Sequence, residues 1–215
     1  MNSTFSIKEA IRFGWTEFKK DPWFFVGVTV ALSLFTIVVD SLTGDRHGIQ
    51  SVLGIIISLI ASTIVTIAYA RLALSTVAGA HVGWNGLWAP QHFFSALGAG
   101  ILQFVIIIVG FILLIVPGVI AGLLLCFTQI ALVDKNLSPV EALKESYRLA
   151  RPHLWQLFLF MLSLLLLNLI GLIALVIGLL VTIPVSLISV AYVYKKLSGA
   201  LEPVVVVPNE AVTPQ

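Results

Sequence analysis

Long apolar segments alternate with short polar connections along this chain. Two of these segments, residues 93–133 and 153–194, contain no Lys, Arg, Asp or Glu over 41 and 42 positions. Roughly 20 helical residues cross a bilayer core of about 30 Å. Each segment is therefore too long for one crossing, and we expect each to fold back as a pair of membrane-spanning helices.

Two shorter apolar segments precede this pair. They cover residues 23 to about 39 and residues 51 to about 74, with a short polar loop between them. The chain is thus predicted to form six spans in three hairpins. The turn of the second hairpin is expected at Pro117–Gly118, because proline is tolerated as the first residue of a helix. The turn of the third is expected between residues 171 and 182.

Basic amphipathic segments stand before the first and the last hairpin. Ser6 with Glu9, and Ser138 with Glu141, fit the capping box that starts a helix. Apolar residues at helical spacing then give each segment an apolar face, as in helices that lie in the headgroup region. The expected apolar faces are Ile7, Ala10, Ile11, Trp15 and Phe18 in the first segment and Val140, Leu143, Tyr147, Ala150 and Leu154 in the last.

The chain also shows an internal repeat. Residues 6–15 align with residues 138–147 without a gap, and Trp23 falls on Trp155 at the same offset. We interpret the sequence as three units, about 6–74, 84–134 and 138–197, each a cytoplasmic interfacial helix followed by two spans. The interfacial helix of the middle unit is degenerate.

These patterns predict an all-α polytopic membrane protein with a single transmembrane domain over residues 1–198. Residues 199–215 are expected to be a disordered cytoplasmic tail, since their prolines and their low capacity to form a core oppose folding. The composition agrees with this class, because 59% of the residues are hydrophobic and only 10% are charged. Such a chain has too few polar side chains to cover a water-facing surface.

The basic residues predict the orientation. With both termini on the cytoplasmic side, eleven of the 12 lysines and arginines lie on that side, and only Arg46 lies opposite. Cytoplasmic loops of membrane proteins carry this excess of positive charge. We therefore expect cytoplasmic N- and C-termini.

Spaced polar and turn residues mark the later part of the chain. These positions are Pro117–Gly118, Asp134, the run Ser138-Pro-x-Glu-Ala-Leu-Lys-x-Ser-x-Arg148, Trp155, Asn168–Gly171 and Thr182–Pro184. With this pattern, roughly residues 90 to 198 resemble a widespread group of bacterial integral membrane proteins. The group includes uncharacterised six-helix proteins and is similar to the membrane domain attached to some glycerophosphodiester phosphodiesterases. The resemblance implies a bacterial inner-membrane location and association with membrane lipid, with no chemistry to transfer.

The sequence contains no pattern typical of a catalytic or metal-binding site. The four histidines show no pair at metal-ligand spacing, and the single cysteine, Cys126, lies in an apolar run without a neighbouring base. We therefore expect no metal, no cofactor and no enzymatic activity. The small net charge of +2 gives no reason to expect a nucleic-acid partner.

Uncharged polar side chains inside the spans allow two interpretations. The set is Gln103, Thr128, Gln129, Asn168, Thr182 and Ser186. In hydrocarbon such groups ordinarily form interhelical hydrogen bonds, and this is the favoured interpretation. The alternative is that they line the path of a small-solute transporter or channel.

The basic side chains of the two amphipathic segments are the main functional candidates. A cation beside an anionic leaflet contributes about 1 kcal/mol to membrane association. We expect anionic lipid headgroups to contact Arg12, Lys19, Lys20, Lys144, Arg148 and Arg151. The sequence thus favours a lipid-associated membrane protein that acts in envelope organisation or lipid homeostasis. A second copy of the chain or another membrane protein is a further candidate partner.

Overall fold

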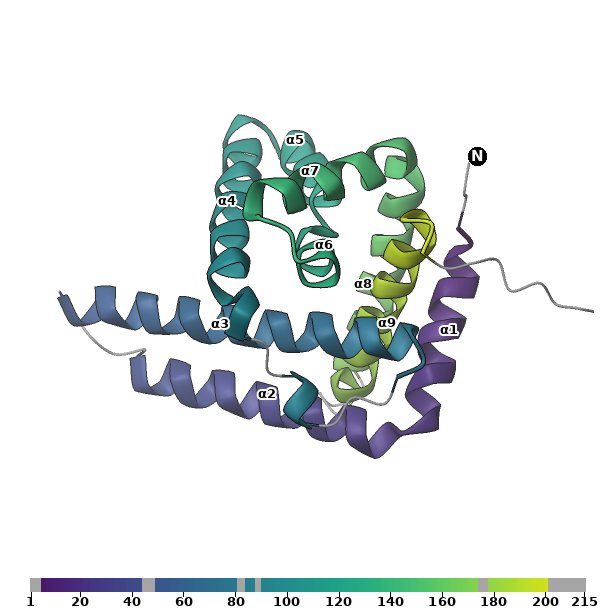
Figure 1. Ribbon diagram of the computed structural model, residues 1–215, viewed down its shortest axis with the longest axis horizontal. Coiled ribbons are helices and arrows are strands. Elements are labelled where there is room, and N and C mark those ends of the chain that lie inside the picture. The colour runs from purple at the N-terminus through teal and green to yellow at the C-terminus, as the bar shows by residue number, and fades with distance from the viewer. Residues whose placement is uncertain (1–4, 44–48, 81–83, 88–89, 174–177, 201–215) are drawn as a thin grey trace, which may run out of the picture.

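The computed structural model describes residues 5–43, 49–80, 84–87, 90–173 and 178–200, and all regular structure in these ranges is helical (Figure 1). The expected tail lies almost wholly outside the described residues. Six segments are long and apolar enough to cross a membrane, as predicted. The elements are α1 (Ile7–Lys20), α2 (Pro22–Thr43), α3 (Ile49–Val77), η1 (Trp84–Leu87), η2 (Pro90–His92), α4 (Phe93–Leu113), α5 (Ile115–Leu124), α6 (Thr128–Lys135), α7 (Pro139–Ala150), η3 (Arg151–His153), α8 (Leu154–Ile173) and α9 (Leu179–Leu197).

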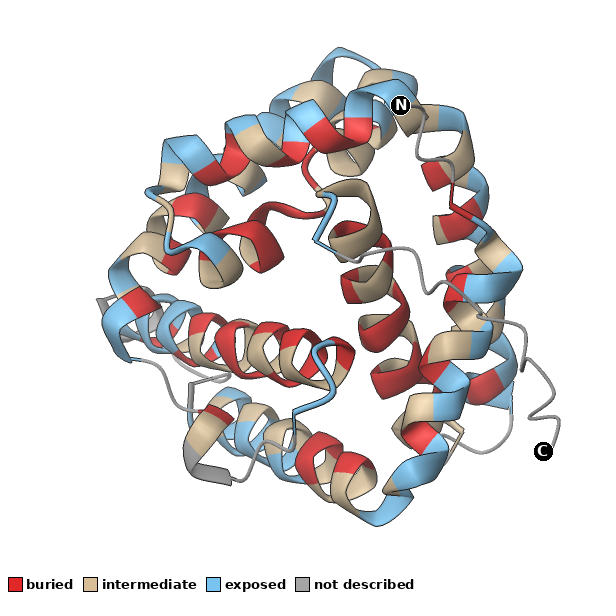
Figure 2. Cartoon of the chain, turned by 45° about the vertical axis from the view of Figure 1, so that its right-hand side comes forward, coloured by how far each residue is buried: buried red, intermediate tan, exposed pale blue. Residues whose placement is uncertain are grey.

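Large apolar side chains cover much of the outer surface. Exposed leucines, isoleucines, valines and phenylalanines recur along residues 34–60, 101–116 and 159–173. Figure 2 shows buried residues on the inner sides of the helices and exposed ones on the outer sides. Soluble proteins rarely expose apolar patches of this extent. The surface therefore fits a multi-pass membrane protein whose outer face contacts lipid.

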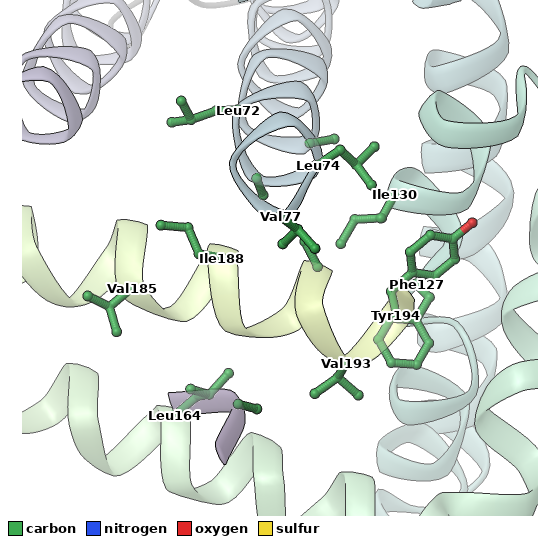
Figure 3. Packing of buried hydrophobic residues seen from close by; sticks show 14 of the residues in the cluster. Leu72, Leu74, Val77, Phe127, Ile130, Leu164, Val185, Ile188, Val193 and Tyr194 are labelled. Atoms are coloured by element: carbon green, nitrogen blue, oxygen red, sulfur yellow. The ribbon is translucent and has the colours of Figure 1, made fainter. Parts of the chain in front are cut away.

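The core is organised around α9. Val185, Ile188, Val193 and Tyr194 of this helix are almost fully buried. Figure 3 shows α9 between Leu74 and Val77 of α3 on one side and Leu164 of α8 on the other. The last helix of the chain therefore contacts elements from every part of the sequence.

Helix α1 packs along α9, which brings the two ends of the described chain together (Figure 1). At Gly14 the two backbones are so close that an added Cβ would lie 2.6 Å from the carbonyl oxygen of Val185. Above this point the Glu9 carboxylate accepts hydrogen bonds from Lys196 Nζ, at 2.9 and 3.0 Å, and from Tyr192 Oη at 2.5 Å. The hydrogen bond from Lys196 lowers the pKa of Glu9 most, and the hydrogen bond from Tyr192 lowers it further. The Glu9 carboxylate thus joins α1 to α9. Of the predicted capping box, the hydrogen bond from the Glu9 N–H to Ser6 Oγ is formed, at 3.4 Å.

The turn of the second hairpin differs from the prediction. The helix break lies at Leu114, which has extended backbone geometry, and Pro117 and Gly118 lie inside the first turn of α5. Gly118 packs instead against α4, where an added Cβ would lie 2.5 Å from the ring of Phe111. Pro117 still occupies a helix start, where its missing N–H is not needed. Helix α2 continues to Thr43, past the residue at which the loop was expected to start. Helix α8 ends and helix α9 begins within residues 171–182, the range predicted for the turn of the third hairpin.

Candidate functional site

The six basic residues expected to contact lipid are all exposed. Four of them have intramolecular partners. Lys20 pairs with Glu17 at 2.7 Å, Arg148 pairs with Glu145 at 2.8 Å, and Lys19 lies over the ring of Trp15. Arg151 lies over the ring of Tyr147, with 5.7 Å between its guanidinium and the ring centroid. The side chains of Arg12 and Lys144 form no hydrogen bond or ion pair within the described residues. These two residues are equivalent in the aligned segments, and both are free to bind an external anion.

Exposed aromatic side chains accompany these cations. Trp15 is 44% exposed and Tyr147 43%, while Trp155, which follows Arg151 by four residues, is 73% exposed. Tryptophan and tyrosine collect at the level of lipid headgroups, where the ring is partly in an apolar environment. The basic residues thus lie beside side chains typical of a membrane interface.

The buried faces of α1 and α7 overlap the predicted apolar faces in part. Ala10, Phe18, Leu143 and Ala150 are buried, whereas Trp15, Val140 and Tyr147 are exposed. The buried positions are Ala10, Gly14 and Phe18 in α1 and Ala142, Leu143, Ser146, Leu149 and Ala150 in α7. Small residues let each helix approach its neighbour closely, so packing against protein sets the rotation of the helix. Trp15, Val140 and Tyr147 consequently remain exposed, as the cations do.

The fourth span is interrupted, which the sequence pattern did not predict. Helix α5 ends at Leu124 and α6 begins at Thr128, and the residues between them form turns. Side chains from other segments satisfy the backbone groups that this break frees. Ser146 Oγ of α7 donates to the Leu124 carbonyl oxygen at 2.8 Å and accepts from the Phe127 N–H at 3.1 Å. Irregular backbone at membrane depth requires such partners.

Two of the predicted intramembrane polar residues also serve this break. Gln103 Nε2 of α4 donates to the Leu125 carbonyl oxygen at 3.1 Å, and Thr128 Oγ1 donates to the same oxygen at 2.8 Å. Gln129 Nε2 donates to the Ala96 carbonyl oxygen at 3.4 Å, joining α6 to α4. The predicted set is therefore brought together in part, around a broken helix.

Asn168 lies apart from this group. Its Nδ2 atom donates to the Leu164 carbonyl oxygen within α8 at 2.9 Å and to Ser186 Oγ of α9 at 3.0 Å. It thus forms the kind of interhelical hydrogen bond that the favoured interpretation expected.

A polar cleft, absent from the sequence-based expectations, lies where α3, α6 and α9 end and η2 begins. Its volume is about 580 Å³. We call it the end cleft; its polar lining residues are Arg71, Ser75, Gln91, His92, Asp134 and Lys195. In the sequence, Arg71 and Lys195 indicate only the orientation in the membrane. Nothing in their spacing shows that four separate segments meet at one cleft.

Ion pairing fixes one side of the end cleft. Asp134 Oδ1 accepts from Lys195 Nζ at 2.6 Å, and Asp134 Oδ2 accepts from Tyr194 Oη at 3.0 Å. The Asp134 carboxylate is therefore engaged by α9. Arg71, on the α3 side, has no hydrogen-bond or ion-pair partner for its guanidinium among the described residues.

Metal-binding groups were sought throughout the described part of the chain. No group of three or more His, Cys, Asp or Glu side chains there could hold a metal ion. Cys126 lies in the break of the fourth span as a free, partly buried thiol.

Comparison with known proteins identifies distant relatives. No family model and no solved structure matches the chain. Over 110 residues it is 30% identical to an uncharacterised protein of Mycobacterium tuberculosis, Rv2560, and to an uncharacterised protein of Mycobacterium bovis, Mb2590. The match covers 51% of this chain and 34% of each relative. The chain therefore spans about a third of the length of the curated relatives that it matches.

Proposed function

We propose that this chain is a non-catalytic bacterial inner-membrane protein that holds anionic lipid against its cytoplasmic face. The observation that carries the proposal is the joint exposure of six cations beside Trp15, Tyr147 and Trp155. These cations are Arg12, Lys19 and Lys20 of α1, Lys144 and Arg148 of α7, and Arg151 of η3. Cations at this level attract anionic headgroups, and interfacial aromatic rings fix the depth of the helices. The biological role that fits is envelope organisation or membrane-lipid homeostasis.

The packing of the surface helices supports the three-unit interpretation that underlies this proposal. Helix α7 packs on α5 and α6, η1 contacts α3, and α1 packs on α9. In the three-unit interpretation, α7 contacts the second span of the middle unit, and η1 contacts α3, the second span of the first unit. Helix α1 contacts α9, the second span of the last unit. The three hairpins would then form a closed ring with all surface helices on the cytoplasmic side.

Lipid selectivity gives a direct test of the proposal. In reconstituted bilayers, acyl-brominated phosphatidylglycerol is expected to quench tryptophan fluorescence more strongly than brominated phosphatidylcholine, because Trp15 and Trp155 lie beside the cations. The triple variant Lys144→Glu, Arg148→Glu and Arg151→Glu reverses three charges. It is expected to lower the preference for phosphatidylglycerol several-fold, since each cation contributes about 1 kcal/mol.

The matched control keeps the charges and changes the residues, with Lys144→Arg, Arg148→Lys and Arg151→Lys, and should retain the preference. Equal quenching by the two lipids in the unaltered protein would refute the lipid proposal. An unchanged preference after charge reversal would refute the part assigned to α7.

A transporter or channel is the alternative, and one observation favours it. A groove of about 530 Å³ between α3 and α4 is lined by Ser62, Thr63, Thr66 and Gln129 among apolar residues. The hydroxyl groups, however, donate to carbonyl oxygens of their own helix. Solute flux into vesicles that contain the protein, at a rate above that of empty vesicles, would favour this alternative over a purely lipid-binding role.

A further inference from the structure

The end cleft contains two hydrogen-bond donors without a protein partner. Arg71 is partly buried, and His92 is only 8% exposed. Neither side chain forms a hydrogen bond or ion pair to any residue that the structure describes. The nitrogens of these two side chains are not among the fully buried polar atoms that lack a partner. They are therefore accessible from the cleft, where an external acceptor can reach them.

The charges of the cleft favour an anion. Arg71 and Lys195 are positive, and Asp134 is the single carboxylate among the lining residues. Asp134 already accepts from Lys195 and Tyr194, so its charge is largely compensated within the protein. The positive charge of Arg71 has no such compensation from the described residues, and the cleft with His92 counted as neutral carries a net charge of +1.

We propose that the end cleft binds a phosphate group, carried by a membrane-lipid headgroup or by a free phosphorylated compound. Arg71 presents the planar fork that binds phosphate oxygens in pairs, and His92 supplies a second donor from η2. The volume of about 580 Å³ accommodates a group larger than phosphate alone. The opening at the ends of α3, α6 and α9 places the site on the side of the membrane assigned to α1 and α7.

This site shares no residue with the exposed cations of α1 and α7. The inference therefore extends beyond the proposed function and can fail separately from it. Charge reversal in α7 is expected to leave phosphate affinity of the end cleft unchanged.

A competing role for Arg71 is purely structural. Arg71 lies in the last two turns of α3, where a cation offsets the negative end of the helix dipole. That role predicts a loss of stability when Arg71 is replaced and no change in phosphate binding. The two roles can thus be separated by measuring affinity.

The test uses the full chain in detergent and isothermal titration calorimetry. One arm titrates inorganic phosphate, and the other titrates dihexanoyl phosphatidylglycerol below its micelle concentration. Arg71→Gln is expected to weaken binding about tenfold or more, because a charge-assisted hydrogen-bond pair is lost. Arg71→Lys keeps the charge without the fork and should be intermediate. Lys8→Gln, at an exposed cation of α1 outside both the end cleft and the six residues assigned to lipid, is the matched control and should bind like the unaltered protein.

Each outcome decides the proposal. Arg71-dependent binding of inorganic phosphate assigns the site to free phosphorylated compounds, and Arg71-dependent binding of phosphatidylglycerol alone assigns it to a lipid headgroup. Binding of neither probe, or equal affinity in the unaltered protein and in Arg71→Gln, would overturn the proposal.

Discussion

Replacing Ser146 with alanine is expected to lower the free energy of unfolding by about 1–3 kcal/mol. Ser146 is fully buried, and its hydroxyl group is at once the donor to the Leu124 carbonyl oxygen and the acceptor for the Phe127 N–H. Alanine fits the same space but leaves both backbone groups unsatisfied. In an apolar environment each such group costs more than the lost hydrogen bond itself. The measurement is the unfolding transition in a denaturing-detergent titration.

Ser163→Ala is the matched control for this prediction. The Ser163 hydroxyl donates only to the Leu159 carbonyl oxygen of its own helix, at 2.8 Å. Its removal leaves no backbone group without a partner, so the change should be within about 0.5 kcal/mol. If Ser146→Ala were as harmless as Ser163→Ala, the break in the fourth span would not depend on α7.

Replacing Gly14 with alanine is expected to separate α1 from α9 and to destabilise the protein by about 1–3 kcal/mol. The new Cβ would lie 2.6 Å from the Val185 carbonyl oxygen and in contact with Ser189 Oγ. Backbone cannot move aside as a flexible side chain can, so the helices must shift. The shift would also lengthen the hydrogen bonds of Glu9 with Tyr192 and Lys196.

Gly122→Ala provides the comparison, since nothing lies within 4 Å of a Cβ added there on α5. In a helix interior this change should stabilise by about 0.5–1 kcal/mol, because glycine loses more chain entropy on folding. Both variants are compared by thermal unfolding in the same detergent. Gly14→Ala with a transition equal to that of the unaltered protein would show that the close contact between α1 and α9 is not needed for stability.

The sequence was sufficient to predict features that depend on local chemistry. The number and approximate limits of the spans follow from apolar length, and the start of α7 follows from Ser138 and Glu141, whose capping box is formed. Apolar length and capping residues can be read locally, because they lie within the helix that they predict or next to it.

Features that depend on distant residues could not be predicted in this way. The break at residues 125–127 contains no glycine or proline. It is stabilised by Ser146 and Gln103, 19 to 22 positions away in the chain. The rotation of α7 likewise depends on which neighbour it packs against. The end cleft combines α3, η2, α6 and α9, and no spacing in the sequence brings these four segments together.

The most direct test of the account is the side of the membrane on which α1 and α7 lie. Single cysteines are placed at Arg12, Lys144 and Ser41, all exposed, in a Cys126→Ala background, and a membrane-impermeant maleimide is applied to spheroplasts and to inverted vesicles. The account predicts labelling at positions 12 and 144 only in inverted vesicles, and at position 41 only in spheroplasts. Labelling of positions 12 and 144 from opposite sides, or of all three from one side, would contradict six spans with a common cytoplasmic face.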